Sequence, residues 1–307
     1  MSLRIAPPIR EALRLGRPVV ALESTVVTHG LPRPQNLTLA HRLEAVVREG
    51  GALPATVGVV SGELVVGLDD DELTLLATCD GADKASTWNL AAVIARRGHA
   101  GTTVATTLHG AAAAGIGVFA TGGIGGVHDH PFDESADLQA LAGASLVTVC
   151  AGPKSILDAA ATLERLETLG VPVIGYRSDR LAGFVVPQTE LPLAARVDAP
   201  SQAADVLRAQ RDLGLSAGVV LSNPVSRGVD PARFDAWLAR ARHDAGRQGV
   251  RGRDTTPFLL ARLAELSDGA TMDVNLRLLE ENARLAAAVA VSLAAAPARN
   301  EVAEVPT

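Results

Sequence analysis

Two kinds of segment alternate along the chain. Short runs rich in Val, Ile, Leu and Ala are typical of buried strands: PVVALEST (18–25), GVFATGG (117–123), SLVTVCAG (145–152), VPVIGY (171–176) and SAGVVLSNP (216–224). Longer amphipathic stretches between them predict helices, such as NLTLAHRLEAVVREGG (36–51), which ends at a glycine pair. This alternation predicts an α/β fold with a largely parallel sheet covered by helices on both faces.

Two regions depart from this regular alternation. LPATVGVVSGELVVGL (53–68) predicts two strands around a Ser61-Gly62 turn, and residues 184–200 are less regular. We therefore expect a mixed sheet rather than a purely parallel one. No repeat and no domain linker stands out, so we predict a single domain over residues 1–307, with roughly 299–307 as a loose tail.

Composition narrows the classes of function. Hydrophobic residues make up 48% of the 307 residues, enough for a sizeable core, but aromatic residues make up only 3%. The net charge of −6 disfavours a nucleic-acid partner, whereas a small anion could still bind to a local group of cations. The longest small-apolar run, residues 285–298, is shorter than the roughly 20 residues that span a bilayer. Cys79 and Cys150 form no CxxC pair. We expect reduced thiols, no membrane partner and a cytoplasmic location.

Three charged residues lie where the pattern predicts strand ends or helix starts. Glu23 follows a buried strand, and it is either solvated or a general acid/base whose pKa is raised by apolar surroundings. Lys84 lies in a polar stretch before a helix, where a plain surface lysine is the simpler interpretation. Lys154 follows a buried strand in AGPKSILD; it is either a structural lysine that caps the following helix or pairs with Asp158, or an amine for Schiff-base chemistry. Open α/β sheets bind ligands at such strand ends.

Two loops could also bind ligands. The turn TGGIGG (121–126) could bring backbone N–H groups close to an anion or be only a tight turn, and it matches neither the dinucleotide fingerprint nor the P-loop. The segment HDHPFDESAD (128–137) is dense in acidic residues and histidines. It could hold Mg²⁺ or Mn²⁺, or be a solvated acidic loop.

Several of these segments, in this order, resemble the pseudouridine-5'-phosphate glycosidase family, also called the indigoidine synthase A-like family. The matching stretches include ALESTVVTHGLP, DKAS, GTTVATTLHGAAAAGIGVFATGGIGGVH, DESADLQAL, VCAGPKSILDAAATLERLETLGVPVIGY, TPFLLARLAELSDG and NLRLLEENARLAA, between residue 18 and about residue 290. The resemblance implies a three-layer α/β/α sandwich with a central mixed, largely parallel sheet, usually assembled as a homotrimer.

The resemblance implies reversible cleavage of the C–C glycosidic bond of pseudouridine 5'-phosphate to uracil and ribose 5-phosphate. A carbon leaving group has no lone pair to protonate, so the two-carboxylate chemistry of ordinary glycosidases does not suffice. In the family, a lysine attacks the anomeric carbon of the ring-opened sugar and forms an imine. Some relatives form C-nucleosides or C-glycosides instead. A Schiff-base aldolase and a phosphosugar-binding protein are the remaining alternatives.

The resemblance also implies residue roles. Lys154 matches the imine-forming lysine, Glu23 the proton donor, Lys84 a substrate-binding lysine and Asp133 the ligand of a divalent metal, usually manganese. The other expected substrate contacts are the Val104 backbone, Thr121 in the glycine turn, His128, the segment Ser135, Ala136 and Asp137, and Asn275, which is expected near the base.

The chain departs from the family pattern at several places. Asp129 stands where an arginine is common, Arg253 where a lysine is common, and Pro153 where a small residue precedes the reactive lysine. The segment RSDRLAGFVVPQTE (177–190) lacks the usual aromatic pair, and NPVSRG lacks the usual Pro-Glu continuation. The sugar-phosphate residues are retained, and the departures fall in segments expected to recognise the base or cover the pocket.

Overall fold

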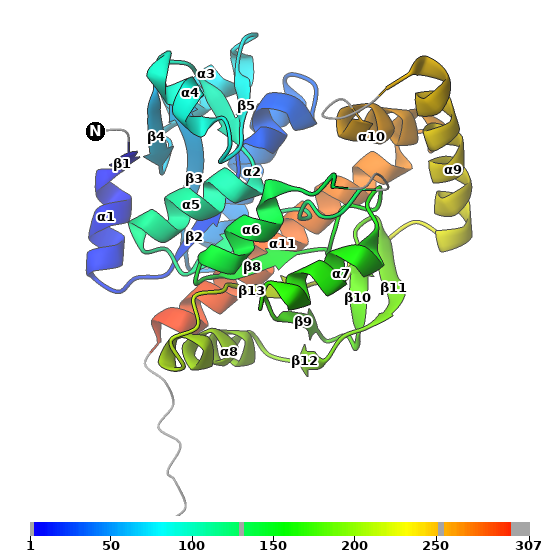
Figure 1. The fold of residues 1–307 in the computed structure, drawn as a ribbon. Coiled ribbons are helices and arrows are strands. Elements are labelled where there is room, and N and C mark those ends of the chain that lie inside the picture. The colour runs from blue at the N-terminus through cyan, green and yellow to red at the C-terminus, as the bar shows by residue number, and fades with distance from the viewer. Residues whose placement is uncertain (1–2, 129–131, 251–254, 296–307) are drawn as a thin grey trace, which may run out of the picture.

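The computed structural model describes residues 3–128, 132–250 and 255–295. Its centre is an 11-stranded mixed sheet (Figure 1). The main strand order is β1-β4-β3-β2-β7-β8-β13-β9-β12, and β6 pairs with both β3 and β5. The strands are β1 (Leu3–Ile5), β2 (Val19–Leu22), β3 (Leu53–Val60), β4 (Glu63–Val66), β5 (Asp83–Ala85), β6 (Ala100–Thr102), β7 (Val118–Ala120), β8 (Val147–Cys150), β9 (Val173–Tyr176), β12 (Ala195–Val197) and β13 (Val219–Ser222).

The sheet is parallel except at β3, which pairs antiparallel with β4 and β6. The β3–β4 hairpin turns at Ser61 and Gly62, as the sequence predicted. Both residues have positive φ. The expectation of a mixed, largely parallel sheet is therefore confirmed. A separate antiparallel hairpin pairs β10 (Arg180–Gly183) with β11 (Val186–Pro192), and β11 lies within residues 184–200, which were predicted to be less regular.

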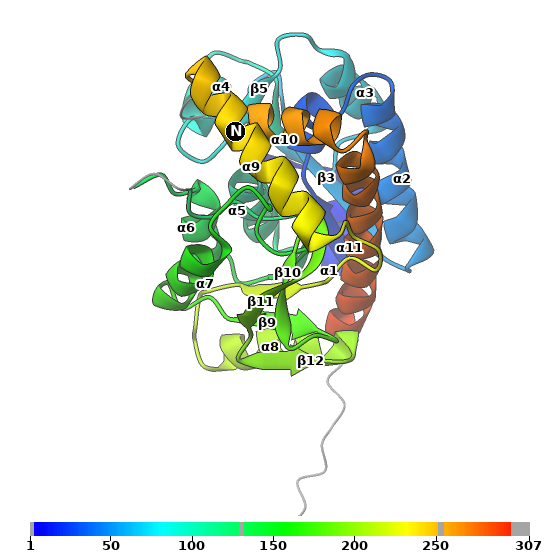
Figure 2. The same cartoon turned by 90° about the vertical axis from the view of Figure 1, so that its right-hand side faces the viewer.

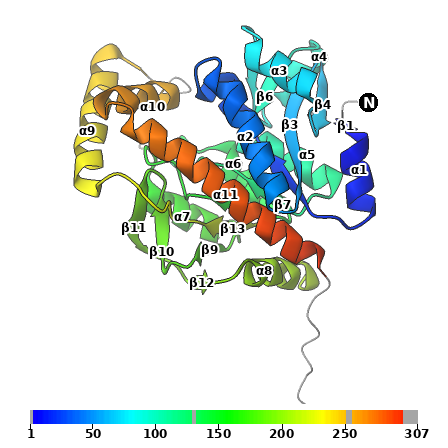
Figure 3. The same cartoon turned by 180° about the vertical axis from the view of Figure 1, so that it is seen from behind.

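Alternate residues of β2 enter different cores, because successive side chains of a strand point to opposite faces. Val20 and Leu22 pack in the cluster that contains α2 (Gln35–Glu49), α8 (Pro200–Asp212) and α11 (Ala270–Ala294). Val19 and Ala21 pack in the cluster that contains α1 (Pro7–Arg14), α5 (Val104–Ala114), α6 (Ala136–Gly143) and α7 (Ala159–Thr168). The first group lies in front of the sheet in Figure 3 and the second in Figure 1, which gives the predicted three layers.

The remaining helices lie toward the ends of the sheet. A π-helical turn, η1 (Val26–Gly30), follows β2, and α3 (Asp70–Thr78) packs with it; α4 (Leu90–Ala95) follows β5. The pair α9 (Pro231–Gln248) and α10 (Thr255–Leu266) lies at the right of Figure 1 and faces the viewer in Figure 2. Among the described helices, none combines the length and the apolar character needed to cross a bilayer.

Parallel pairing places the carboxyl ends of β2, β7, β8 and β13 side by side. Glu23 follows β2, Thr121 follows β7, Asn223 follows β13, and Lys154 lies four residues beyond β8. Functional side chains that are distant in sequence therefore meet at one edge of the sheet, as expected for an open α/β fold.

Candidate active site

A cavity of about 360 Å³ opens at this edge of the sheet. Four of the predicted residues line it: Glu23, Lys84, Lys154 and Asn275. The wall also includes apolar side chains from the β10–β11 hairpin, α9, α10 and α11: Phe184, Val185, Phe234, Leu260, Leu263, Met272 and Leu279. The cavity thus combines a charged part with a mostly apolar part, an arrangement typical of small-molecule sites.

Glu23 stands at the end of β2, and its carboxylate is partly shielded from solvent. The Thr121 hydroxyl donates a hydrogen bond to Glu23 Oε1. Burial raises the pKa of Glu23, and the positive charge of Lys154 and the Thr121 bond oppose this rise without cancelling it. A carboxyl group with a raised pKa can keep its proton near neutral pH and donate it, as the proton-donor role requires.

Lys84 and Lys154 are the only two lysines among the 307 residues, although the chain has 26 arginines (28 Lys plus Arg, minus two Lys). Both lysines line the same cavity. Arginine cannot lose its proton in a protein, whereas a lysine amine can become neutral and act as a nucleophile. The location of both lysines of an arginine-rich chain in one cavity points to amine chemistry there. No single motif reveals this bias of the composition.

Lys84 lies in the middle of β5, beside Gly101 of β6. Its side chain has a large accessible area, yet it lines a cavity wall, and burial together with the positive charge of Lys154 lowers the pKa of Lys84. The negative charges of Glu23 and Asp137 act in the opposite direction. The cavity therefore holds at least one amine that loses its proton more readily than a surface lysine.

Lys154 lies in the loop that connects β8 to α7. Its backbone N–H donates to Ile124 O at 3.1 Å, which fastens the loop to the glycine turn. Among the described residues, no ion pair joins Lys154 to Asp158, whose carboxylate instead caps α7 by accepting from the Ala161 N–H at 2.9 Å. The structural alternative for Lys154, an ion pair at i+4, is therefore not formed, and α7 begins only at Ala159.

Asp137 ties together three predicted segments. Its Oδ1 accepts from Ala105 N–H at 2.9 Å, next to Val104 at the start of α5, and its Oδ2 accepts from Gly125 N–H at 2.8 Å in the glycine turn. Ser135 caps α6 and accepts from the Asp137 N–H at 3.2 Å. Asp137 is only 5% exposed, so it holds these segments in place from below the surface.

The other predicted substrate contacts are not among the residues that line the cavity: Val104, Thr121, His128, Ser135, Ala136 and Asp137. Thr121 and Asp137 nevertheless act on Glu23, by hydrogen bond and by charge. The His128 N–H donates to Asp133 O at 2.9 Å. Asp129, Arg253 and the predicted tail at 299–307 lie outside the described residues.

Asp133, the predicted metal ligand, is partly exposed, and its carboxylate makes no hydrogen bond or ion pair with a described residue. Within the described ranges, no group of three His, Cys, Asp or Glu residues could enclose a metal ion. Mg²⁺ and similar hard cations are often held by one or two carboxylates together with water and a substrate phosphate. The carboxylate of Asp133, which has no partner among the described residues, is compatible with that arrangement.

His29 is a cavity residue that the sequence interpretation did not select. It is the fourth of the five residues of the π-helical turn η1, and its Nδ1 lies 2.6 Å from the Thr28 hydroxyl. Burial and the nearby charge of Lys84 lower the pKa of His29, so its neutral form is favoured. Its presence in the motif ALESTVVTHGLP was the available signal.

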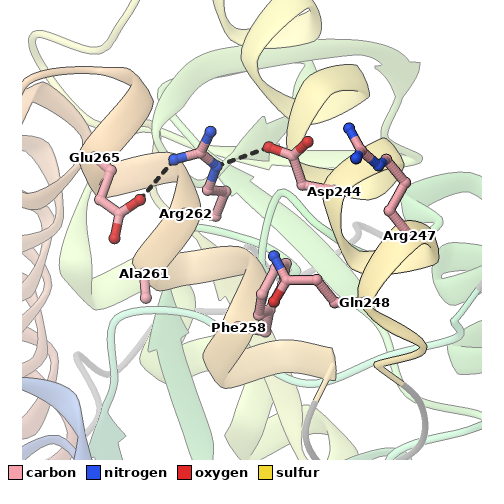
Figure 4. Close-up of a pocket in the computed structure, with 7 residues that line it drawn as sticks. All are labelled: Asp244, Arg247, Gln248, Phe258, Ala261, Arg262 and Glu265. Carbon is pink, nitrogen blue, oxygen red and sulfur yellow. Dashed lines mark hydrogen bonds and ion pairs between the residues drawn. The ribbon is translucent and has the colours of Figure 1, made fainter.

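A second cavity, of about 600 Å³, lies between α9 and α10 (Figure 4). Its charged groups largely satisfy one another: Arg262 donates to Asp244 at 2.8 Å and to Glu265 at 2.7 Å. It contains neither lysine and none of the strand-end residues. This cavity is the larger of the two, but the candidate catalytic residues line the smaller one.

Comparison with known proteins identifies relatives of this chain. The family described as indigoidine synthase A like protein matches residues 8–292. A pseudouridine-5'-phosphate glycosidase of Thermus thermophilus is 57% identical over 90% of this chain and 98% of the relative; one of Salinispora tropica is 53% identical over 95% and 92%.

Two solved structures have the same fold. The prealnumycin C-glycosynthase in complex with ribulose 5-phosphate has a TM-score of 0.88 and 38% identity, and an indigoidine synthase A-like protein from Thermotoga maritima has a TM-score of 0.87 and 33% identity. Each comparison covers 95% of this chain and 97% of the other. On these matches of sequence and fold, the chain belongs to the indigoidine synthase A-like family.

Proposed function

We propose that this protein reversibly cleaves the C–C glycosidic bond of pseudouridine 5'-phosphate, giving uracil and ribose 5-phosphate. The observation that carries the proposal is the convergence of Glu23 and both lysines of the chain on one cavity. The names of relatives up to 57% identical support the substrate.

Glu23, whose protonated form is favoured by its raised pKa, donates its proton to the ribose ring oxygen as the C1'–O4' bond breaks, and the electron pair of that bond stays on O4'. The Lys154 amine, in its unprotonated form, bonds to C1' through its nitrogen lone pair and then gives a proton to the Glu23 carboxylate, which restores a lone pair on nitrogen. When the C1'–C5 bond breaks, its electron pair goes to uracil C5, which takes up a proton. The nitrogen lone pair forms the C=N bond of an imine, so electrons balance. Water hydrolyses the imine, which releases ribose 5-phosphate and regenerates the amine.

The remaining cavity residues suit binding. Lys84 supplies a positive charge for the phosphate, and Asn275, on α11, offers an amide to the polar edge of the base. The apolar residues from α9, α10 and the β10–β11 hairpin would pack against the base and exclude water. We also propose that Asp133 holds Mn²⁺ or Mg²⁺, which would neutralise phosphate charge when bound. Homotrimeric assembly and a cytoplasmic location complete the proposal; two unpaired cysteines support a reducing compartment.

The imine can be trapped at a defined residue. Incubation with ribose 5-phosphate and borohydride should give a stable adduct, and peptide mass spectrometry should place it on Lys154. Because only two lysines exist, the matched control is direct: Lys84→Arg should keep the adduct on Lys154, and Lys154→Arg should lose it. Full uracil release by Lys154→Arg would contradict the nucleophile role.

A second candidate is a C-glycosynthase that joins ribose 5-phosphate to a different carbon acid. The similarity to a prealnumycin C-glycosynthase and the extensive apolar wall of the cavity favour it as the alternative. Uracil release from pseudouridine 5'-phosphate distinguishes the two, because a synthase for another aglycone would form the Lys154 adduct without releasing uracil. Release of no base from any C-nucleotide would instead favour an aldolase or a phosphosugar-binding protein.

A further inference from the structure

A pair of asparagine amides lies beside the cavity and is not explained by substrate binding. Asn282 is on α11, seven residues after Asn275, so the two lie about two helical turns apart on similar faces of the helix. Asn275 lines the cavity, whereas Asn282 is only 1% exposed. Asn223 immediately follows β13.

The two asparagines connect three segments of the chain through hydrogen bonds. Asn282 Nδ2 donates to Thr121 O at 2.8 Å and to Gly122 O at 3.3 Å, while Asn282 Oδ1 accepts from Asn223 Nδ2 at 3.0 Å. The Asn223 backbone N–H donates to Cys150 O at 2.8 Å, at the end of β8. The pair therefore joins the turn after β7, the end of β8 and the start of the loop after β13 to one helix.

Each of these connections leads to a reacting group. The Thr121 carbonyl is held by Asn282, and the hydroxyl of the same residue donates to Glu23. Cys150 ends the strand whose following loop carries Lys154. An amide donates and accepts without changing charge, so these bonds persist while protons move at Glu23.

We propose that the Asn223–Asn282 pair is a positioning device that fixes the Thr121 hydroxyl on Glu23 and holds the Glu23 turn in register with the Lys154 loop. This inference rests on the proposed function. Misplacement of a catalytic group by about 1 Å can cost roughly a hundredfold in rate, so loss of the pair should lower kcat more than it weakens binding.

The test compares Asn282→Ala with Asn223→Ala, using uracil release from pseudouridine 5'-phosphate. Asn223 is only partly buried, so its variant remains informative if Asn282→Ala does not fold. We expect kcat to fall about tenfold to a hundredfold with KM little changed. The control is Gln202→Ala, which removes an amide that holds two backbone N–H groups near the start of α8, at the edge of the sheet; its kcat should not change.

Two readouts separate positioning from simple stabilisation of the fold. The hydrogen bond from Thr121 lowers the pKa of Glu23, so weakening this bond should move the limb that reports Glu23 in the plot of kcat/KM against pH to higher pH. The other charged residues that act on Glu23 are unchanged in these variants: Lys154, Asp137 and Lys84. If Asn282 acts through Thr121, Asn282→Ala and Thr121→Val should also be non-additive in a double-mutant cycle.

An unchanged kcat in both asparagine variants, or a lower kcat with an unshifted limb and additive effects, would overturn the inference while leaving the proposed function intact. Failure of the proposed function is seen separately. A wild-type protein that neither releases uracil nor forms a Lys154 adduct defeats that proposal before any asparagine variant is compared.

Discussion

Asp137 should be one of the most sensitive residues for the stability of this fold. Its carboxylate accepts two backbone hydrogen bonds, from Ala105 at 2.9 Å and from Gly125 at 2.8 Å, at a position that is 5% exposed. Hydrogen bonds to charged groups contribute about 1.5–3 kcal/mol each, and an alanine would leave both N–H groups without this acceptor. We therefore expect Asp137→Ala to lower the free energy of unfolding by about 3–6 kcal/mol.

The matched control is Asp230→Ala. Asp230 also accepts a backbone N–H, from Arg233 at 3.0 Å, but it is exposed and makes this single bond as the N-cap of α9. Loss of such a cap costs about 1 kcal/mol. Asp137→Asn, which keeps one acceptor oxygen, should fall between the two alanine variants.

Urea titration at one fixed protein concentration, analysed by linear extrapolation, measures all three variants against the wild type. A domain typically has about 5–15 kcal/mol of stability, so the expected loss in Asp137→Ala is a large fraction of the total. If Asp137→Ala loses no more stability than Asp230→Ala, the carboxylate does not hold α5 and the glycine turn together, and the reasoning is refuted.

Three further outcomes are expected. Burial raises the pKa of Cys150 to about 12, so a thiol reagent at pH 8 should modify Cys79 in the native protein and Cys150 only after unfolding; labelling of both at equal rates would contradict this. Gly152 has φ +83°, and a Cβ there would lie 2.1 Å from a backbone oxygen of β10, so Gly152→Ala should reduce both stability and uracil release. Gly170 has φ +71° and open space around it, so Gly170→Ala should cost only about 1–2 kcal/mol of stability. The pKa of Glu23 is raised in the folded state, so the contribution of Glu23 to stability is fully present below the unfolded-state pKa near 4.5 and is lost as pH rises through the folded-state pKa. Glu23→Gln should therefore be more stable than wild type at pH 8 but not at pH 4. Equal differences at both pH values would argue against a raised pKa.

The hydrophobic pattern predicted the layers well because strands and helices each bury a regular face. The β3–β4 hairpin and the strands 19–22, 147–150, 173–176 and 219–222 all fall within the predicted runs. The pattern failed where local geometry is set by tertiary contacts. The π-helical turn that carries His29 and the late start of α7, five residues after Lys154, have no periodic signature.

The site was predicted in part, and for a physical reason. Glu23, Lys84, Lys154 and Asn275 belong to motifs, and the structure brings them to one cavity. Asn282 was not selected, because a buried asparagine within a helical run looks like any other helical position until its partners are known. Those partners, immediately after β7 and β13, are 161 and 59 residues away in sequence, and local spacing contains no information about such contacts.

The position of α11 has a consequence for synthesis of the protein. This helix carries Asn275 and Asn282 and covers β2, β7 and β8, yet it is the last described element of the chain. Until residues 270–294 have been synthesised, the part of the sheet face that α11 covers, on β2, β7 and β8, stays exposed to water. A nascent chain without α11 would therefore expose apolar surface and be inactive. A chain truncated before residue 270 should be a substrate for chaperones and proteases rather than a partly active enzyme.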